Sequence, residues 1–176
     1  MVISSFMAYK YRSSRNDFYL FGAVDEIRET EYGTEVHGHV TYPGVSTCTT
    51  LTLALADGSV IGAHFAKPDP TAAVDAIVTQ MNVVRAGRAV SHMYVVGVLR
   101  CRDAEGFMGT PRYAWPTLIT TFNQAFGRAP GAVAQGFIQT SGGRDYRAVS
   151  AGAAGMMWLS RPQGRAGWEV LPLEGL

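Results

Sequence analysis

The chain has 176 residues, which is one domain's worth of sequence and enough to bury a sizeable hydrophobic core. Apolar residues make up 47% of it and charged residues only 16%, which is not the composition of a disordered chain. The 15 basic and 14 acidic residues nearly cancel, so no overall charge attracts nucleic acid or an acidic membrane surface. We therefore expect a single domain over residues 1–176, with neither nucleic acid nor a membrane as partner.

The N-terminus and the cysteines indicate the compartment. The segment MVISSFMAYKYRSSRND lacks the apolar run and cleavage site of a signal peptide, and no stretch reaches the ~18 apolar residues of a membrane span. Two cysteines, Cys48 and Cys101, do not make a disulfide framework in a chain with a large core. We expect both to be free thiols in a reducing compartment.

Strand patterns dominate the first third of the chain and a helix follows them. Alternating or β-branched residues predict strands over residues 17–24, 34–42, 49–56 and 60–66, with Asp57-Gly58 as the hairpin turn between the last two. The next segment predicts a helix with Asp69 as N-cap, Pro70 as its first residue and Gly87 as its stop. The apolar face of this helix comprises Val74, Ile77, Val78, Met81 and Val84.

The second half mixes strands with one shorter helix. The patterns predict a strand over 91–101, a helix over 115–127 ended by Gly127, strands over 132–139, 145–151 and 155–160, and a last strand within 161–176. This order lacks the regular alternation and Gly-rich loop of a doubly wound nucleotide fold. We predict an α+β fold: a β-sandwich-like core of mixed, mainly antiparallel strands, with helices near 70–86 and 115–126 packed outside.

One cysteine has neighbours that suit a nucleophile. Cys48 follows a turn of small residues, and pairing through Asp57-Gly58 would bring it close to His64 at the open end of one hairpin. In that turn Gly44 permits an unusual backbone angle, and the backbone at Ser46 and Thr47 could hold an oxyanion or substrate carbonyl. On spacing alone, however, a lone cysteine is more often a buried, inert core residue.

A catalytic reading of this pair predicts its protonation state. Thiols react as thiolates, so we expect a partly exposed Cys48 in an ion pair with His64 and a pKa below that of a free cysteine. Cys101 has no histidine near it in sequence and is expected to be structural. His37 and His39 lack a further ligand at metal spacing, and His92 has no evident partner, so no metal or other cofactor is predicted.

The segment around the pair resembles a known family. Gly44-Val45-Ser46-Thr47-Cys48, then an apolar strand, a Gly-containing turn, Gly62-Ala63-His64 and Pro68, is similar to the CheD family of protein-glutamine deamidases. The resemblance covers about residues 35–160 and extends to the cytotoxic necrotizing factors and Burkholderia lethal factor, toxins of the same superfamily. It implies a cofactor-free thiol hydrolase that converts a glutamine of another protein to glutamate through a Cys48 thioester, with His64 as the base.

Two departures from the family pattern concern the site. This chain has Ser46-Thr47 where the family has Gly-Ser before the cysteine, and Tyr42 where the family has a threonine that orients the histidine. Thr41 is one position away, so it can orient His64 only if a bulge at Pro43-Gly44 restores its direction. We take Thr41 as the third site residue, with the Tyr42 hydroxyl or a backbone carbonyl as the alternatives.

The setting is expected from the resemblance together with the departures from it. The poor match at Gly-Ser-Cys, the N-terminal segment without a counterpart and the aromatic-rich C-terminal tail favour a bacterial effector or toxin that acts on a protein with a surface glutamine. We expect a monomer, in the bacterial cytoplasm or delivered from it without a cleavable signal peptide. The alternatives are a CheD-type deamidase of chemoreceptors, a non-catalytic binding module on the same fold, and another thiol hydrolase such as a small peptidase or peptidoglycan amidase. The short spacing between Cys48 and His64 argues against the last of these.

Overall fold

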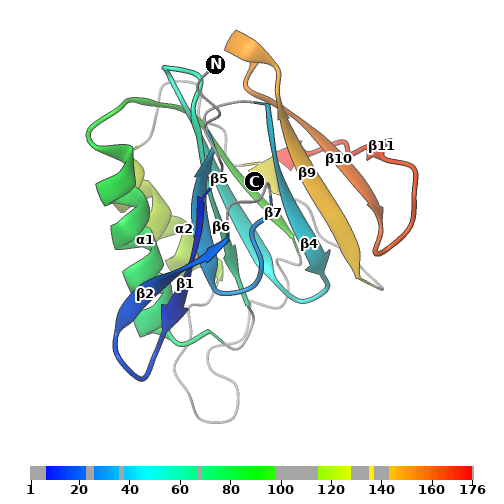
Figure 1. Ribbon diagram of the computed structural model, residues 1–176. Coiled ribbons are helices and arrows are strands. Elements are labelled where there is room, and N and C mark those ends of the chain that lie inside the picture. The colour runs from blue at the N-terminus through cyan, green and yellow to red at the C-terminus, as the bar shows by residue number, and fades with distance from the viewer. Residues whose placement is uncertain are drawn as a thin grey trace.

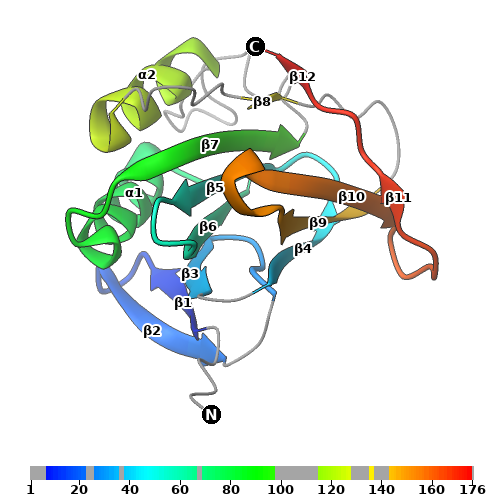
Figure 2. The same cartoon turned by 90° about the horizontal axis from the view of Figure 1, so that it is seen from above.

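In the part of the chain that the structure describes, two sheets and two helices form three layers. The computed structural model describes residues 7–22, 26–35, 38–66, 69–97, 115–127, 135–136 and 143–175. In this part of the chain the two helices cover one face of a large sheet, and a smaller sheet lies on its other side (Figures 1 and 2). The α+β class, the two packed sheets and the outer position of the helices are as predicted from the sequence.

The larger sheet has eight strands among the described residues. In chain order they are β1 (Met7–Arg12), β2 (Asp17–Gly22), β3 (Glu31–Glu35), β5 (Thr49–Leu55), β6 (Val60–Phe65), β7 (Val90–Gly97), β8 (Gln135–Gly136) and β12 (Glu174–Gly175). Across the sheet their order is β12-β8-β7-β5-β6-β3-β1-β2, and each neighbouring pair is antiparallel except β7 with β8. The β5–β6 hairpin therefore occupies the middle of the sheet.

The smaller sheet is antiparallel throughout its described strands. These are β4 (His39–Val45), β9 (Arg144–Ser150), β10 (Met156–Pro162) and β11 (Glu169–Val170), in the order β11-β10-β9-β4. A short 3-10 helix, Gly152–Ala154, lies between β9 and β10. The single strand predicted over 34–42 is wrong: it is two strands, β3 and β4, in different sheets. Gly38, with φ +89°, lies where the chain passes from one sheet to the other.

The helices are α1 (Thr71–Arg85) and α2 (Trp115–Phe126). The predicted apolar face of α1 is buried except for Val84, which is partly buried. The N-cap of the helix is Pro70 rather than Asp69. Pro70 has extended backbone angles, so the helix begins one residue later than predicted. The Asp69 carboxylate instead accepts hydrogen bonds from the Ala66 N–H and the Thr30 hydroxyl, and so ties the entry of the helix to the turn before β3.

The larger sheet is buried on both faces, so it separates two hydrophobic cores. Residues that alternate along a strand point to opposite faces. Leu51, Leu53, Ile61 and Phe65 pack under the helices, whereas Ala54, Val60 and Val96 face the smaller sheet. The second core contains the stacked rings of Tyr42 and Trp158, and it encloses the candidate site.

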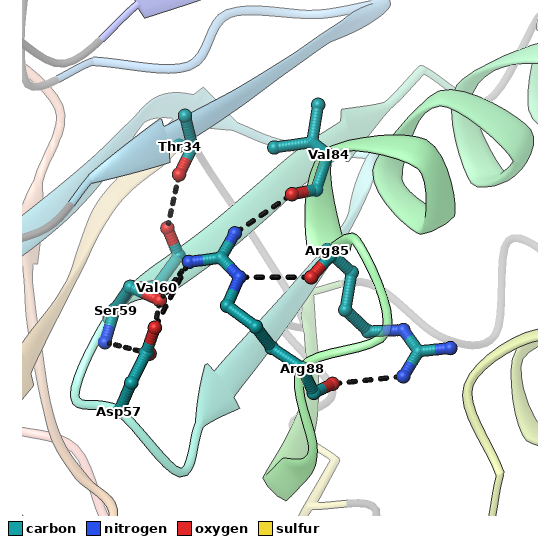
Figure 3. Close-up of polar contacts among 7 residues, drawn as sticks. All are labelled: Thr34, Asp57, Ser59, Val60, Val84, Arg85 and Arg88. Carbon is teal, nitrogen blue, oxygen red and sulfur yellow. Dashed lines mark hydrogen bonds and ion pairs between the residues drawn. The ribbon is translucent and has the colours of Figure 1, made fainter.

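Arg88 ties the closed end of the β5–β6 hairpin to the end of α1 (Figure 3). Its guanidinium donates hydrogen bonds to the carbonyls of Val84 and Arg85 and to the Ser59 hydroxyl, and it forms an ion pair with Asp57 at 3.2 Å. A lysine has a single ammonium group and cannot make all of these contacts at once. The contacts hold the hairpin at the end remote from Cys48 and His64.

We expect Arg88→Lys to lower the free energy of unfolding by about 2 kcal/mol, because it leaves helix carbonyls and Ser59 without their donor. Urea denaturation measures this loss. Arg85→Lys is the matched control, because the Arg85 guanidinium contacts exposed Asn82 and one carbonyl, and it should cost less than about 0.5 kcal/mol. Equal losses in the two variants would contradict the proposed importance of the Arg88 contacts.

Candidate functional site

Cys48 and His64 are neighbours, as the hairpin predicted. His64 lies in β6 directly opposite Thr50 of β5, and Cys48 immediately precedes that strand. Because Cys48 and Thr50 are two residues apart, both face the smaller sheet together with His64. A nitrogen of the His64 ring lies within 4.8 Å of the Cys48 sulfur.

A main-chain carbonyl orients the His64 ring. His64 Nδ1 lies 3.0 Å from the carbonyl oxygen of Ile27, which can only accept, so Nδ1 carries the proton. Nε2 then holds a free lone pair. It is buried and has no hydrogen-bond partner among the described residues. The histidine is thus held as a neutral base with its basic nitrogen unoccupied.

The role predicted for the Thr41 side chain is filled by Ile27. Val40 and Tyr42 point into the core between the sheets, so Thr41 faces the other way, where its hydroxyl accepts a hydrogen bond from Arg147. Thr41 still contributes through its backbone, because its carbonyl accepts the Ile27 N–H at 2.9 Å. The expected bulge exists between Tyr42 and Val45, but it follows Thr41 along the chain and does not redirect it.

Tyr42 packs against His64 without orienting it by hydrogen bonding. The two rings meet edge to face with centroids 6.1 Å apart. The Tyr42 hydroxyl forms a hydrogen bond with the Thr52 hydroxyl. It also lies over Gly62, where a Cβ atom would collide with it. Of the three predicted ways to orient His64, the backbone carbonyl is the one present.

Glu29 is the site residue that the sequence did not indicate. The Cys48 thiol donates a hydrogen bond to a Glu29 carboxylate oxygen at 2.9 Å. Glu29 is an exposed residue in the turn before β3, and the next residue, Thr30, fixes this turn by donating its N–H to the His64 carbonyl. A charged residue 19 positions before the cysteine has no spacing signal, so only the fold brings it to the site.

Burial keeps both members of the pair neutral, which overturns the expected ion pair. Only 1% of Cys48 is exposed, and burial followed by the Glu29 hydrogen bond raises its pKa to about 12. His64 is fully buried, and burial lowers its pKa to about 4 despite the Ile27 carbonyl and the Glu29 charge. The desolvation cost of both charged forms outweighs their attraction, so the resting site is a thiol and a neutral imidazole.

The turn before Cys48 contains the residues for which an oxyanion site was predicted, Gly44, Ser46 and Thr47. Gly44 has φ +64°, and its N–H donates to the buried Asp145 carboxylate at 2.9 Å. Ser46 and Thr47 are exposed, and hydrogen bonds from their backbone to the Cys48 sulfur favour its anionic form.

Glu29→Gln should make Cys48 more reactive, because it removes the negative charge that opposes the thiolate. At pH 7.5 each unit by which the Cys48 pKa falls increases the thiolate fraction about tenfold. In a Cys101→Ser background, we expect iodoacetamide to label wild-type Cys48 far more slowly than a free thiol, and Glu29→Gln to accelerate that labelling about tenfold. Mass spectrometry over time gives the rates.

The control for this experiment is Glu26→Gln, which removes a nearby carboxylate that is ion-paired with Arg28 instead. It should leave the labelling rate unchanged. Rapid labelling of the wild type at pH 6.5, at the rate of a free thiol or faster, would contradict the neutral resting state.

Two other candidate histidines are among the described residues, and both have other neighbours. His39 stands opposite Val149 in the smaller sheet, and His92 stacks on Tyr94 with its Nδ1 near the Ser91 hydroxyl. His37, Pro68 and Cys101 lie outside the described residues. The structure therefore assigns no chemistry to the remaining histidines that it describes.

Neither of the described helices combines the length and hydrophobicity that crossing a membrane requires. The sequence matches no model of a protein family, and no curated protein matches it. What the protein does must therefore be argued from the site itself.

Proposed function

We propose that this protein is a cysteine-dependent amide hydrolase that deamidates glutamine side chains of other proteins. The observation that carries the proposal is the placement of the Cys48 thiol beside a neutral His64 whose Nε2 is free and whose Nδ1 is held by Ile27. A nucleophile, an adjacent base and a group that orients the base are the parts that thiol catalysis requires.

The reaction would begin from the neutral pair. A substrate carboxamide displaces Glu29 from the thiol, and His64 Nε2 takes the thiol proton as Cys48 sulfur attacks the amide carbon. Backbone N–H groups of the turn at Ser46 and Thr47 hold the oxyanion. His64 returns the proton to the nitrogen, the carbon–nitrogen bond breaks, and ammonia leaves a Cys48 thioester. Water, deprotonated by His64, then hydrolyses the thioester to glutamate and regenerates the thiol.

The resemblance to CheD-like and cytotoxic necrotizing factor-like deamidases narrows the substrate to a protein. It rests on the residues from Gly44 to Cys48 and on the Gly-x-His segment at His64. The mainly antiparallel two-sheet architecture is compatible with that family's fold. We propose accordingly that the chain is a monomeric bacterial effector or toxin that modifies a surface glutamine, with modification of chemoreceptors as the alternative role.

One observation favours a second candidate, a binding module without catalysis. Cys48 is almost fully buried and its pKa is raised, as in an inert core cysteine. The free Nε2 lone pair argues for catalysis, because an inert core usually satisfies its buried polar atoms. The two candidates differ in whether any substrate loses ammonia.

The deciding experiment is incubation of wild type and Cys48→Ser with casein and with candidate target proteins. Deamidation releases ammonia and adds about 1 Da for each amide converted to an acid, which intact-mass and peptide analysis detect. We expect conversion by the wild type and none above background by Cys48→Ser.

Cys101→Ser is the matched control, because it removes the other thiol of the chain and should remain active. If Cys48→Ser converted glutamine as fast as the wild type, the proposed nucleophile would be wrong. If the wild type modified no protein in the panel while Cys48 remained unreactive even in Glu29→Gln, the binding-module reading would replace the deamidase.

A further inference from the structure

The site contains three different metal-ligating atoms. A Glu29 carboxylate oxygen, the Cys48 sulfur and a His64 nitrogen all lie within 4.8 Å of one another. Zinc is bound by these three donor types at about 2.0–2.3 Å, so the ligand atoms of one tetrahedral ion lie roughly 3.3–3.8 Å apart. Small side-chain movements would bring the three atoms to that spacing.

His64 is already arranged as a metal ligand. It is fully buried, its Nε2 has no hydrogen-bond partner among the described residues, and its Nδ1–H donates to the Ile27 carbonyl. Histidines that bind metals commonly donate their second ring N–H to a carbonyl, which fixes the tautomer and the direction of the free lone pair. A metal ion would give this buried lone pair the partner that it lacks.

The donor set selects the kind of ion. Thiolate and imidazole suit Zn²⁺ and Co²⁺, whereas Mg²⁺ and Ca²⁺ require oxygen ligands. Three protein ligands leave a fourth tetrahedral position for water. Glu29 is exposed, so an ion can reach the cluster from its side.

We propose that Glu29, Cys48 and His64 bind one Zn²⁺ or Co²⁺ ion. Binding replaces the sulfur–hydrogen bond of Cys48 by a sulfur–metal bond and releases that proton to solvent. The ion occupies the sulfur and the nitrogen that the proposed hydrolase uses, so the metal-bound form cannot attack an amide through Cys48. Metal binding is therefore a separate property of the site that would hold the enzyme inactive.

The test is a titration of the Cys101→Ser protein with Co²⁺, without substrate. We expect a near-ultraviolet sulfur-to-cobalt band and visible tetrahedral bands that saturate at one ion per chain and disappear when Zn²⁺ is added. Cys48→Ser should lose the sulfur-to-cobalt band, and Glu29→Gln and His64→Asn should each weaken binding roughly 100-fold or more. Glu26→Gln, outside the cluster, should bind as the wild type does.

A spectrum without a sulfur-to-cobalt band at millimolar Co²⁺ would overturn the proposal, and so would a band that survives unchanged in both Glu29→Gln and His64→Asn. Circular dichroism identifies any variant that fails to fold. In that event the native protein decides the question: Zn²⁺ should protect Cys48 from alkylation and EDTA should reverse the protection, and absence of protection counts against the site. Deamidation is assayed separately in EDTA, so the metal-binding proposal and the deamidase proposal are tested independently of each other.

Discussion

Replacing His64 with asparagine is expected to lower the rate of glutamine deamidation by about 10³-fold, the usual contribution of a positioned general base. Asparagine can still donate a hydrogen bond to the Ile27 carbonyl from about the place of Nδ1, but it has no basic nitrogen toward Cys48. The fold should therefore survive while proton transfer is lost. Ammonia release under single-turnover conditions with a modified protein substrate measures the change.

His64→Ala is the matched comparison, because it removes the base and also leaves the buried Ile27 carbonyl unpaired. It should lose the same activity and in addition about 1–3 kcal/mol of unfolding free energy. If the asparagine variant kept more than about a tenth of the activity, His64 would not be the base.

The same substitution should change how stability depends on pH. The pKa of His64 is lowered by burial to about 4, so between pH 6.5 and pH 4 the unfolded chain binds a proton that the folded protein does not. Above pH 6.5 the histidine is neutral in both the folded and the unfolded chain, so it causes no loss of stability. As the pH drops from 6.5 to 4, it lowers the free energy of unfolding by about 3 kcal/mol. Urea unfolding should show that loss in the wild type and a loss smaller by this amount in His64→Asn. Identical pH profiles would contradict the lowered pKa.

Gly62→Ala should be among the most destabilising single changes in the β5–β6 hairpin, with a loss of about 3 kcal/mol. A Cβ atom at this position would overlap the Tyr42 hydroxyl and stand 2.7 Å from the end of the Ile27 side chain. Both are fully buried, so neither can move aside without disturbing the core between the sheets. Because Ile27 holds His64, the change should also impair activity in the fraction that remains folded.

Two further variants separate this clash from a general effect of removing glycine. Gly58→Ala, in the hairpin turn, has φ +86° but open space around it, so it should cost only about 1 kcal/mol. Adding Tyr42→Phe to Gly62→Ala removes the hydroxyl that the new methyl group meets and should recover part of the loss. A Gly62→Ala variant no less stable than Gly58→Ala would show that the core has more room than the contacts indicate.

The elements with the clearest local patterns were the easiest to predict. The β5–β6 hairpin and both helices have clear apolar periods and turn glycines, and the structure confirms them. The segment over 34–42 failed because its alternation continues across a change of sheet, and a residue pattern does not record which sheet a strand joins. The N-terminal strand β1 was not predicted, although it pairs with both β2 and β3.

The sequence predicted the part of the site that forms by local pairing and missed the part that forms by packing of distant segments. Cys48 and His64 meet through local pairing within one hairpin, which turn chemistry and spacing can indicate. Glu29 reaches them only through the packing of a turn against β6, and the resulting burial and negative charge reverse the expected acidity of the thiol. Thr41 was chosen by its place in the sequence, and strand alternation sends its side chain to the other face.

The hydrogen bonds at Ile27 have a practical consequence for mutagenesis and design. The Ile27 carbonyl accepts a hydrogen bond from His64 and the Ile27 N–H donates one to the Thr41 carbonyl, so the backbone of one residue links strands of the two sheets. A scan that truncates one side chain at a time leaves both groups in place and would pass over their part in the site. Replacing Ile27 with proline deletes the N–H and would reveal the part that this group plays in the site. Grafting the Cys48–His64 pair onto another hairpin would likewise require the backbone of residues 26–30 to be copied with it.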